Sequence, residues 1–168
     1  AAAAADDPLF RHVNLFTKRQ KYDASDGYSL TSAWDVTTSV TTEHKNGLKP
    51  MGTVSANTGS DISAVIPDVI DFDTDQVTVA LNRKGQKSFV TGTYYGSFFR
   101  NNIAFMSWQN WATGPTATGA GTVNTMSSPP DNNFNQPSGT AGYTFSRKAQ
   151  LVASGSYARN TQNATFLT

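Results

Sequence analysis

Residues 28–41 alternate apolar and polar side chains for longer than a half-buried strand of a soluble protein usually does. Successive side chains of a strand point to opposite faces, so the pattern gives one apolar wall and one polar wall. The apolar wall would carry Tyr28, Leu30, Trp34, Val36 and Val40. The polar wall would carry Asp35, Thr37, Ser39 and Thr41. We predict one antiparallel strand over residues 28–43, with the apolar wall toward lipid and Trp34 near the middle of the membrane.

The length of this segment favours a membrane protein. From Tyr28 to Val40 the strand would run roughly 40 Å at about 3.4 Å per residue, whereas strands of soluble sheets centre on about 5–6 residues. Tilted by about 45°, it would cover close to 30 Å, against a lipid-facing band of about 25 Å in outer-membrane barrels. The fold class expected is therefore all-β, an antiparallel transmembrane β-barrel of the outer-membrane type.

The composition agrees with a barrel. Hydrophobic residues make up 38% of the chain and charged residues 15%, against about 45–50% and about 25% in ordinary soluble domains. The surplus of Thr, Ser, Asn and Gly suits a polar lumen and polar loops. No apolar run approaches the ~20 residues of a membrane helix. The net charge of +1 gives no electrostatic reason to expect nucleic acid as a partner.

Turn residues divide the chain into six to eight expected strands. We predict turns at Asp23–Gly27 and Asn46–Gly47. Residues 61–72, which include Pro67, are expected to form a loop. The expected division of the chain is a poly-alanine stretch, either linker or unassigned residues, at 1–5; a barrel segment at 6–168; and within it a long loop at about 110–137.

Two hairpins are expected, at 75–83 with 88–99 and at 138–145 with 150–157. In the second hairpin the outward residues would be Ala141, Tyr143, Phe145, Leu151, Ala153 and Tyr157. The inward residues of this hairpin and the polar wall of residues 28–41 are together expected to line the lumen, where they could contact a partner. They are Asp35, Thr37, Ser39, Thr41, Thr140, Thr144, Gln150 and Ser154.

Catalytic and metal-binding patterns are not found in the sequence. The only histidines, His12 and His44, lie far apart, and cysteine is absent. The carboxylates between Asp68 and Asp75 lack the ligand order and closing Glu of an EF-hand, so we expect a solvated turn. No nucleophile is paired with a base. We expect no enzyme activity, no metal site and no cofactor bound by this chain.

Three segments resemble patches of the MtrB/PioB family of outer-membrane β-barrels, which are associated with decahaem cytochromes. Tyr94–Asn101 is similar to the family's Y-x-x-S-x-F-x-N patch, Pro129–Asn132 to its P-D-N patch, and Thr161–Leu167 to its Q-N-x-x-F-L patch. The region from Glu43 to Gly47 is similar to a charged turn of the family. The likeness runs from about Leu9 to Leu167. Family members are several times longer, so the resemblance implies that this chain is part of a barrel.

The resemblance also implies a function. The protein would be a sheath in the bacterial outer membrane that houses a multihaem c-type cytochrome, so that electrons cross the membrane. Haem c would belong to the partner, and an extracellular cytochrome would be a further partner.

Two alternatives remain open at this point. One is a complete eight-stranded outer-membrane barrel with a structural or adhesive role. The other is a secreted β-sandwich that binds carbohydrate, with sugar rings stacked on Tyr94, Tyr95, Trp108 and Trp111.

Overall fold

The structure, a computed structural model, describes residues 12–57, 60–109 and 123–163. The strands are β1 (Phe16–Thr31), β2 (Trp34–Asn57), β3 (Ser60–Lys84), β4 (Ser88–Asn101), β5 (Phe105–Gln109), β6 (Val123–Ser127), β7 (Asn132–Ser146), β8 (Ala149–Ser156) and β9 (Arg159–Gln162). In these ranges, no helix is long and apolar enough to cross a membrane.

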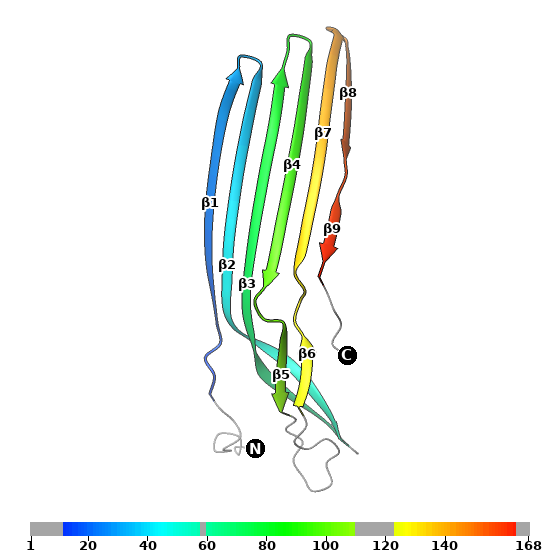
Figure 1. The fold of residues 1–168 in the computed structure, drawn as a ribbon. Helices are drawn as coiled ribbons and strands as arrows, with labels where there is room; N and C mark the ends of the chain where they lie inside the picture. The colour runs from blue at the N-terminus through cyan, green and yellow to red at the C-terminus, as the bar shows by residue number, and fades with distance from the viewer. Residues whose placement is uncertain (1–11, 58–59, 110–122, 164–168) are drawn as a thin grey trace.

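The main sheet has seven antiparallel strands in the order β1-β2-β3-β4-β7-β8, with β9 pairing with β7 beyond the end of β8 (Figure 1). β5 and β6 form a separate two-stranded sheet. Within the described chain the main sheet is open, with β1 at one edge and β8 and β9 at the other. The predicted all-β, antiparallel partial barrel is confirmed, and seven strands fall within the expected six to eight.

The prediction of one strand over residues 28–43 is wrong, because the chain reverses at Ser32 and Ala33. Thr31 pairs with Trp34, and the Thr31 hydroxyl accepts a hydrogen bond from the Ala33 N–H at 3.2 Å. The two-residue turn and the register shift between Ser29 and Thr31 together leave Tyr28 directly opposite Val36, so the alternation of the sequence continues from one strand into the next. Periodicity therefore could not locate the turn.

The expected turn at Asp23–Gly27 is also wrong, since these residues lie inside β1. Their polar side chains are accommodated by the neighbouring strand. The Thr41 hydroxyl donates to the Asp23 carboxylate at 2.6 Å, and Asp26 pairs with Thr38. Turn-forming residues do not break a strand when both its backbone and its side chains find partners across the sheet.

Asn46–Gly47 does not form a turn either, because β2 continues through it to Asn57. Gly47 has a φ of 144°, a conformation that side-chain-bearing residues rarely adopt. The segment 61–72, expected as a loop, belongs to β3. Pro67 of β3 lies opposite Pro50 of β2. The described pairing of β1 with β2 and of β4 with β3 has ended before these positions, so neither proline has to donate a backbone hydrogen bond to an outer neighbour there.

The two predicted hairpins are confirmed. β3 and β4 are joined through Gly85, whose N–H donates to the Ser88 carbonyl at 2.7 Å, and β7 and β8 turn at Arg147–Lys148. The loop expected at 110–137 is too long, since β6 and the first part of β7 lie within it. Residues 132–137 pair with β4, and this pairing makes them part of a strand although their composition is typical of a loop. Residues 1–5 and 110–122 lie outside the described residues.

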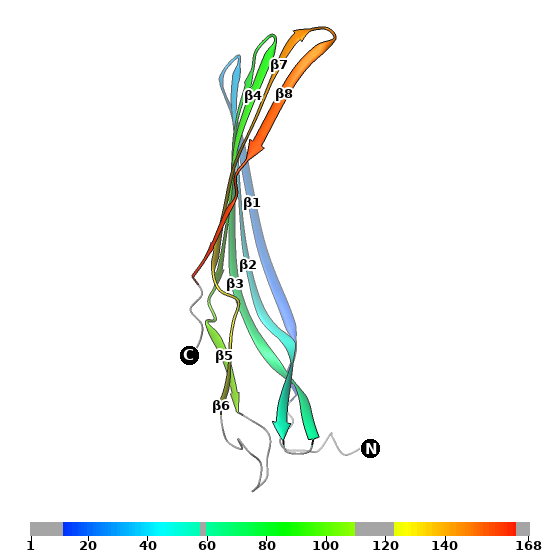
Figure 2. The same ribbon diagram turned by 90° about the vertical axis from the view of Figure 1, so that its right-hand side faces the viewer.

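The main sheet is a single twisted layer, as its edge view shows (Figure 2). Among the side chains that the structure describes, those of residues 12–53, 65–108 and 123–163, Ile70 at 3% exposure is the only buried hydrophobic one. Large apolar side chains such as Leu81 (39%) and Leu151 (61%) are exposed. Because no second layer covers the sheet, its apolar surface must be covered by something outside the described chain.

Replacing Gly47 with alanine should weaken the β1–β2 pairing. A Cβ at this position would collide with the Phe16 carbonyl oxygen, and the positive φ would be strained. We expect a loss of more than about 1 kcal/mol in the free energy of unfolding, measured by urea titration in lipid vesicles. Gly52→Ala is the matched control, because nothing lies within 4 Å of its added Cβ. Equal stability of the two variants would contradict the strained geometry at Gly47.

Candidate functional site: the two faces of the sheet

The strand register places all eight predicted lumen residues on one face of the main sheet, because directly opposed residues of paired strands point to the same side. One row across the sheet contains Asp35, Asn82, Thr91, Thr140 and Ser154. The next row along β2 begins at Thr37, followed by rows at Ser39 and Thr41, while Thr144 pairs with Gln150. We call this surface the polar face.

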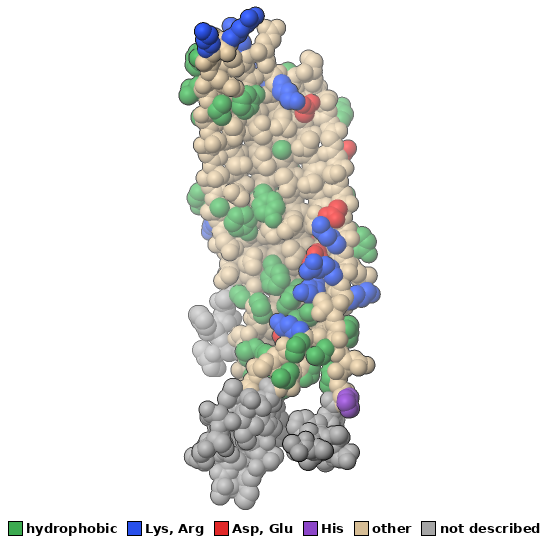
Figure 3. Space-filling view, turned by 180° about the vertical axis from the view of Figure 1, so that it is seen from behind, with side chains coloured by type: hydrophobic (Ala, Val, Ile, Leu, Met, Phe, Trp, Pro, Cys, Tyr) green, Lys and Arg blue, Asp and Glu red, His purple; other side chains and the backbone are tan. Residues whose placement is uncertain are grey.

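The polar face is wider than the sequence analysis predicted. The register adds Gln76, Thr78, Asn82, Thr91, Thr93 and Gln136. For Gln76, Thr78 and Asn82, the alternation of apolar and polar residues over 75–83 already indicates a common polar side in the sequence. Thr91 donates to the Asn82 side chain at 3.0 Å, so neighbours on this face bond to one another. Seen in space-filling form, this face is mostly uncharged over β3, β4 and β7 (Figure 3).

Charged side chains on the polar face gather over β1 and β2 (Figure 3). They form three ion pairs, each at 3.1 Å: Arg19 with Glu43, Lys21 with Asp23, and Lys49 with Asp68. A pair in which both side chains are exposed, such as Lys21 with Asp23, contributes about 0–1 kcal/mol. The main effect of the three pairs is to leave the β1–β2 side of this face nearly neutral overall.

Aromatic side chains also lie on the polar face, toward the end of the sheet away from the short turns. Phe72 and Phe99 have ring centroids 5.3 Å apart, and Tyr95 and Phe134 are 6.0 Å apart. Tyr94, next to Tyr95, points to the opposite face, where its hydroxyl donates to Asn135 at 2.6 Å. Tyr94 and Tyr95 therefore cannot form one sugar-stacking platform.

The opposite surface, the apolar face, carries the residues predicted to point outward. Its exposed members include Tyr28, Val40, Val79, Leu81, Val90, Tyr94, Tyr143 and Leu151. Trp34 is on this face but beside the turn, with the Arg83 guanidinium 5.8 Å from its ring, and not near the middle as predicted. Thr38 and Asp26 interrupt the apolar surface near the edge strand β1.

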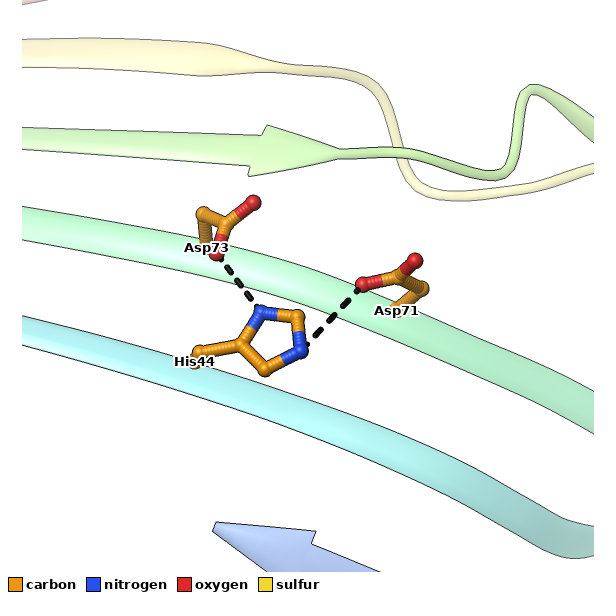
Figure 4. Close-up of side chains that lie close together, drawn as sticks. All are labelled: His44, Asp71 and Asp73. Atoms are coloured by element: carbon orange, nitrogen blue, oxygen red, sulfur yellow. Dashed lines mark hydrogen bonds and ion pairs between the residues drawn. The ribbon is translucent and has the colours of Figure 1, made fainter. Parts of the chain in front are cut away.

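His44, Asp71 and Asp73 form a compact polar cluster (Figure 4). The register places it on the apolar face, where the apolar rows end. His44 Nδ1 is 2.7 Å from Asp73 Oδ1, and His44 Nε2 is 3.8 Å from Asp71 Oδ1. The Asn102 amide donates to both carboxylates, at 3.2 Å and 2.9 Å. Hydrogen bonds from Asn102 and His44 hold the pKa of the Asp73 carboxyl below its usual value.

This cluster corrects the expected solvated turn between Asp68 and Asp75, which is part of β3. Asp68 is buried at 9% exposure and paired, on the polar face. His44 and Asp73 are opposed residues of β2 and β3, although they are 29 positions apart in the sequence. Only the register of a long hairpin brings them together, and neither residue's local sequence indicates it.

The three family-like patches of the sequence meet at one junction. The Asp131 carboxylate accepts hydrogen bonds from the Asn101 N–H at 2.8 Å and from the Asn163 side chain at 3.0 Å. The Asn101 side chain donates to the Pro129 carbonyl at 2.9 Å. These hydrogen bonds connect the end of β4 with the start of β7 and with the end of β9.

Removing the Asn163 amide should loosen β9. Asn163→Ala deletes one hydrogen bond to Asp131, which costs about 0.5–1.5 kcal/mol. We expect faster hydrogen exchange over residues 159–163, measured by mass spectrometry on the protein in detergent. Asn160→Ala, at an exposed asparagine within β9, is the control. Unchanged exchange in Asn163→Ala would show that the junction does not hold this strand.

The comparison with known proteins agrees with this geometry. The family model of the outer membrane beta-barrel porin MtrB/PioB matches residues 6–168, nearly the whole chain. No curated protein matches the chain. An open antiparallel sheet with one apolar and one polar face is the arrangement expected for part of such a barrel wall. The chain belongs to the MtrB/PioB family of outer-membrane β-barrel porins.

Proposed function

We propose that this protein forms part of a barrel wall that sheathes a multihaem c-type cytochrome in the bacterial outer membrane. The observation that carries the proposal is the polar face, a broad field of Ser, Thr, Asn and Gln opposite an exposed apolar face. The cytochrome itself is implied by the family resemblance. The outer-membrane barrel is supported independently, by the family match and by the fold.

The apolar face would contact lipid. Along β2 it runs from Trp34, beside the turn, to Thr42, where the charged cluster begins. Eight residue steps cover roughly 27 Å along the strand. Tilted by about 40°, they give about 20 Å of height, close to the apolar band of about 25 Å in such barrels.

The two ends of the sheet differ, and this difference suggests how the barrel is oriented. The three short turns, at Ser32–Ala33, 85–87 and Arg147–Lys148, all lie at one end (Figure 1). At the other end the β2–β3 hairpin projects beyond the neighbouring strands, and the β5–β6 sheet lies there too. Outer-membrane barrels have short periplasmic turns and longer extracellular loops. We therefore place the short turns in the periplasm.

The polar face would line the lumen and contact the cytochrome. Its hydroxyl and amide groups offer many hydrogen bonds of about 0.5–1.5 kcal/mol each, directly or through water. No single contact should dominate. The haems would carry the electrons, while the wall excludes lipid and insulates them, so the protein itself catalyses no reaction in this proposal.

The two alternatives fit the structure less well. A β-sandwich packs two sheets face to face about 10 Å apart, whereas the main sheet of the described chain is one layer. A closed eight-stranded barrel fills its interior with side chains. The polar face instead carries mostly small hydroxyl side chains and spans an open sheet, which suits a wide lumen.

A charge on the lipid-facing side should be far more costly than the same charge on the lumen side. Val79 lies near the middle of the apolar face and Thr78 is its neighbour on the polar face. We expect Val79→Arg to lower the free energy of unfolding by about 2–4 kcal/mol and Thr78→Arg to lower it much less. Urea unfolding in lipid vesicles measures both. A larger loss of stability in Thr78→Arg than in Val79→Arg would mean that the polar face, and not the apolar face, contacts lipid.

The intact protein should co-purify with a multihaem c-type cytochrome seated in the lumen. Thr78→Trp would introduce a bulky ring on the polar face and should reduce the amount of haem that co-purifies. Val79→Trp, one residue along on the apolar face, should leave it unchanged. Haem staining and absorbance of the purified complex give the ratio.

Transport of electrons tests the sheath directly. Liposomes that contain a redox dye are assembled with the barrel alone or with barrel plus cytochrome, and an external reductant is added. We expect dye reduction only with both proteins, and little leakage of small solutes through the complex. Electron transfer by the barrel alone, or free solute flow through the assembled complex, would contradict the proposal.

A further inference from the structure

We propose that the His44–Asp71–Asp73 cluster binds a divalent transition-metal cation such as Zn²⁺. His44 Nε2 and an Asp71 carboxylate oxygen would be the protein ligands, and water would complete the coordination. Asp73 would act through His44 as a positioning residue. This site lies on the apolar face, so it does not depend on what occupies the lumen.

The spacing of the two ligand atoms fits a shared cation. His44 Nε2 and Asp71 Oδ1 are 3.8 Å apart, too far for a hydrogen bond. Zn–N and Zn–O bonds of about 2.0–2.2 Å at a tetrahedral centre separate two ligand atoms by about 3.4 Å. A displacement of a few tenths of an ångström would bring both atoms into coordination. One nitrogen or oxygen ligand atom from each of His44, Asp71 and Asp73 lies within 4.8 Å of the others.

The other nitrogen of the imidazole is already held as metal-binding histidines usually are. His44 Nδ1 lies 2.7 Å from Asp73 Oδ1, and a hydrogen bond there fixes the ring so that Nε2 points toward Asp71 (Figure 4). Ligating histidines almost always donate their second N–H to such a partner. Asn102 in turn donates to both carboxylates, which orients them toward the imidazole.

The local charges also favour a cation. Arg100 lies opposite Asp73 in the register and is 3.7 Å from Asp75, so one cation faces the three carboxylates of Asp71, Asp73 and Asp75. Asp75 also accepts a hydrogen bond from the Thr42 hydroxyl at 2.5 Å. Asp71 and Asp73 share His44 and the neutral Asn102 amide. The side chains of His44, Asp71 and Asp73 are 35–39% exposed, so an ion can reach them from solvent. An imidazole beside carboxylates selects zinc-like metals over calcium, which prefers oxygen ligands alone.

Zinc titration of the intact protein in detergent, followed by isothermal calorimetry, tests the site. We expect one cation per chain to bind at this site. His44→Ala and Asp71→Asn should each weaken this binding at least about tenfold, and Asp73→Asn by about 10–100-fold, the usual effect of removing an orienting partner. His12→Ala, which removes the other histidine, and Asp23→Asn, on the polar face, should leave the affinity unchanged.

Cobalt substitution provides a readout that a merely structural role would not change. Co²⁺ bound through His44 should give visible absorption bands that disappear in His44→Ala but persist, shifted, in Asp73→Asn. Heat modifiability on gel electrophoresis confirms that each variant is folded. The proposal is overturned if wild-type protein binds Zn²⁺ no more tightly than His44→Ala, or if His12→Ala and His44→Ala lose binding equally.

Discussion

A one-layer sheet has no core of its own, and the rest of the structure depends on this constraint. Among the side chains that the structure describes, Ile70 is the one buried hydrophobic residue, so apolar burial between these elements contributes little. Cohesion comes from the backbone ladders that join each strand to its neighbours. Each face must then be covered by its surroundings, lipid on one side and the polar contents of a lumen on the other. The apolar or polar character of each face therefore matches the surroundings that cover it.

Strand register carries unusual weight in such a sheet. A slip of one residue would turn every apolar side chain to the polar face. Several features oppose a slip. Gly47 fits only where its backbone approaches Phe16, and the Asn101–Asp131–Asn163 junction fixes three strand ends. The junction residues come from the three patches that carry the family resemblance, which gives those patches a structural reason to recur.

The faces could be predicted from the sequence, but the turns could not. Alternation identifies which side chains share a face. It survives the two-residue turn because the register shift between Ser29 and Thr31 restores it, so Tyr28 and Val36 share a face although they lie on different strands. Asp23–Gly27 and Asn46–Gly47 look like turns locally, yet the neighbouring strands satisfy their backbone. The His44–Asp73 pair depends on the register of a hairpin that is more than twenty residues long on each side, and no local pattern encodes it.

The distribution of charge on the polar face bears on how a partner would be held. Acidic and basic groups there are largely neutralised within the wall, as in the pairs of Arg19 with Glu43 and of Lys49 with Asp68. The remaining surface over β3, β4 and β7 offers neutral hydroxyl and amide groups. A partner in the lumen would therefore be held by shape and by many weak hydrogen bonds, and not by a strong opposite charge. Because screening by salt acts on charges, such a complex would keep its position over a wide range of ionic strength, as the proposed sheath, exposed to the periplasm and to the outside medium, would require.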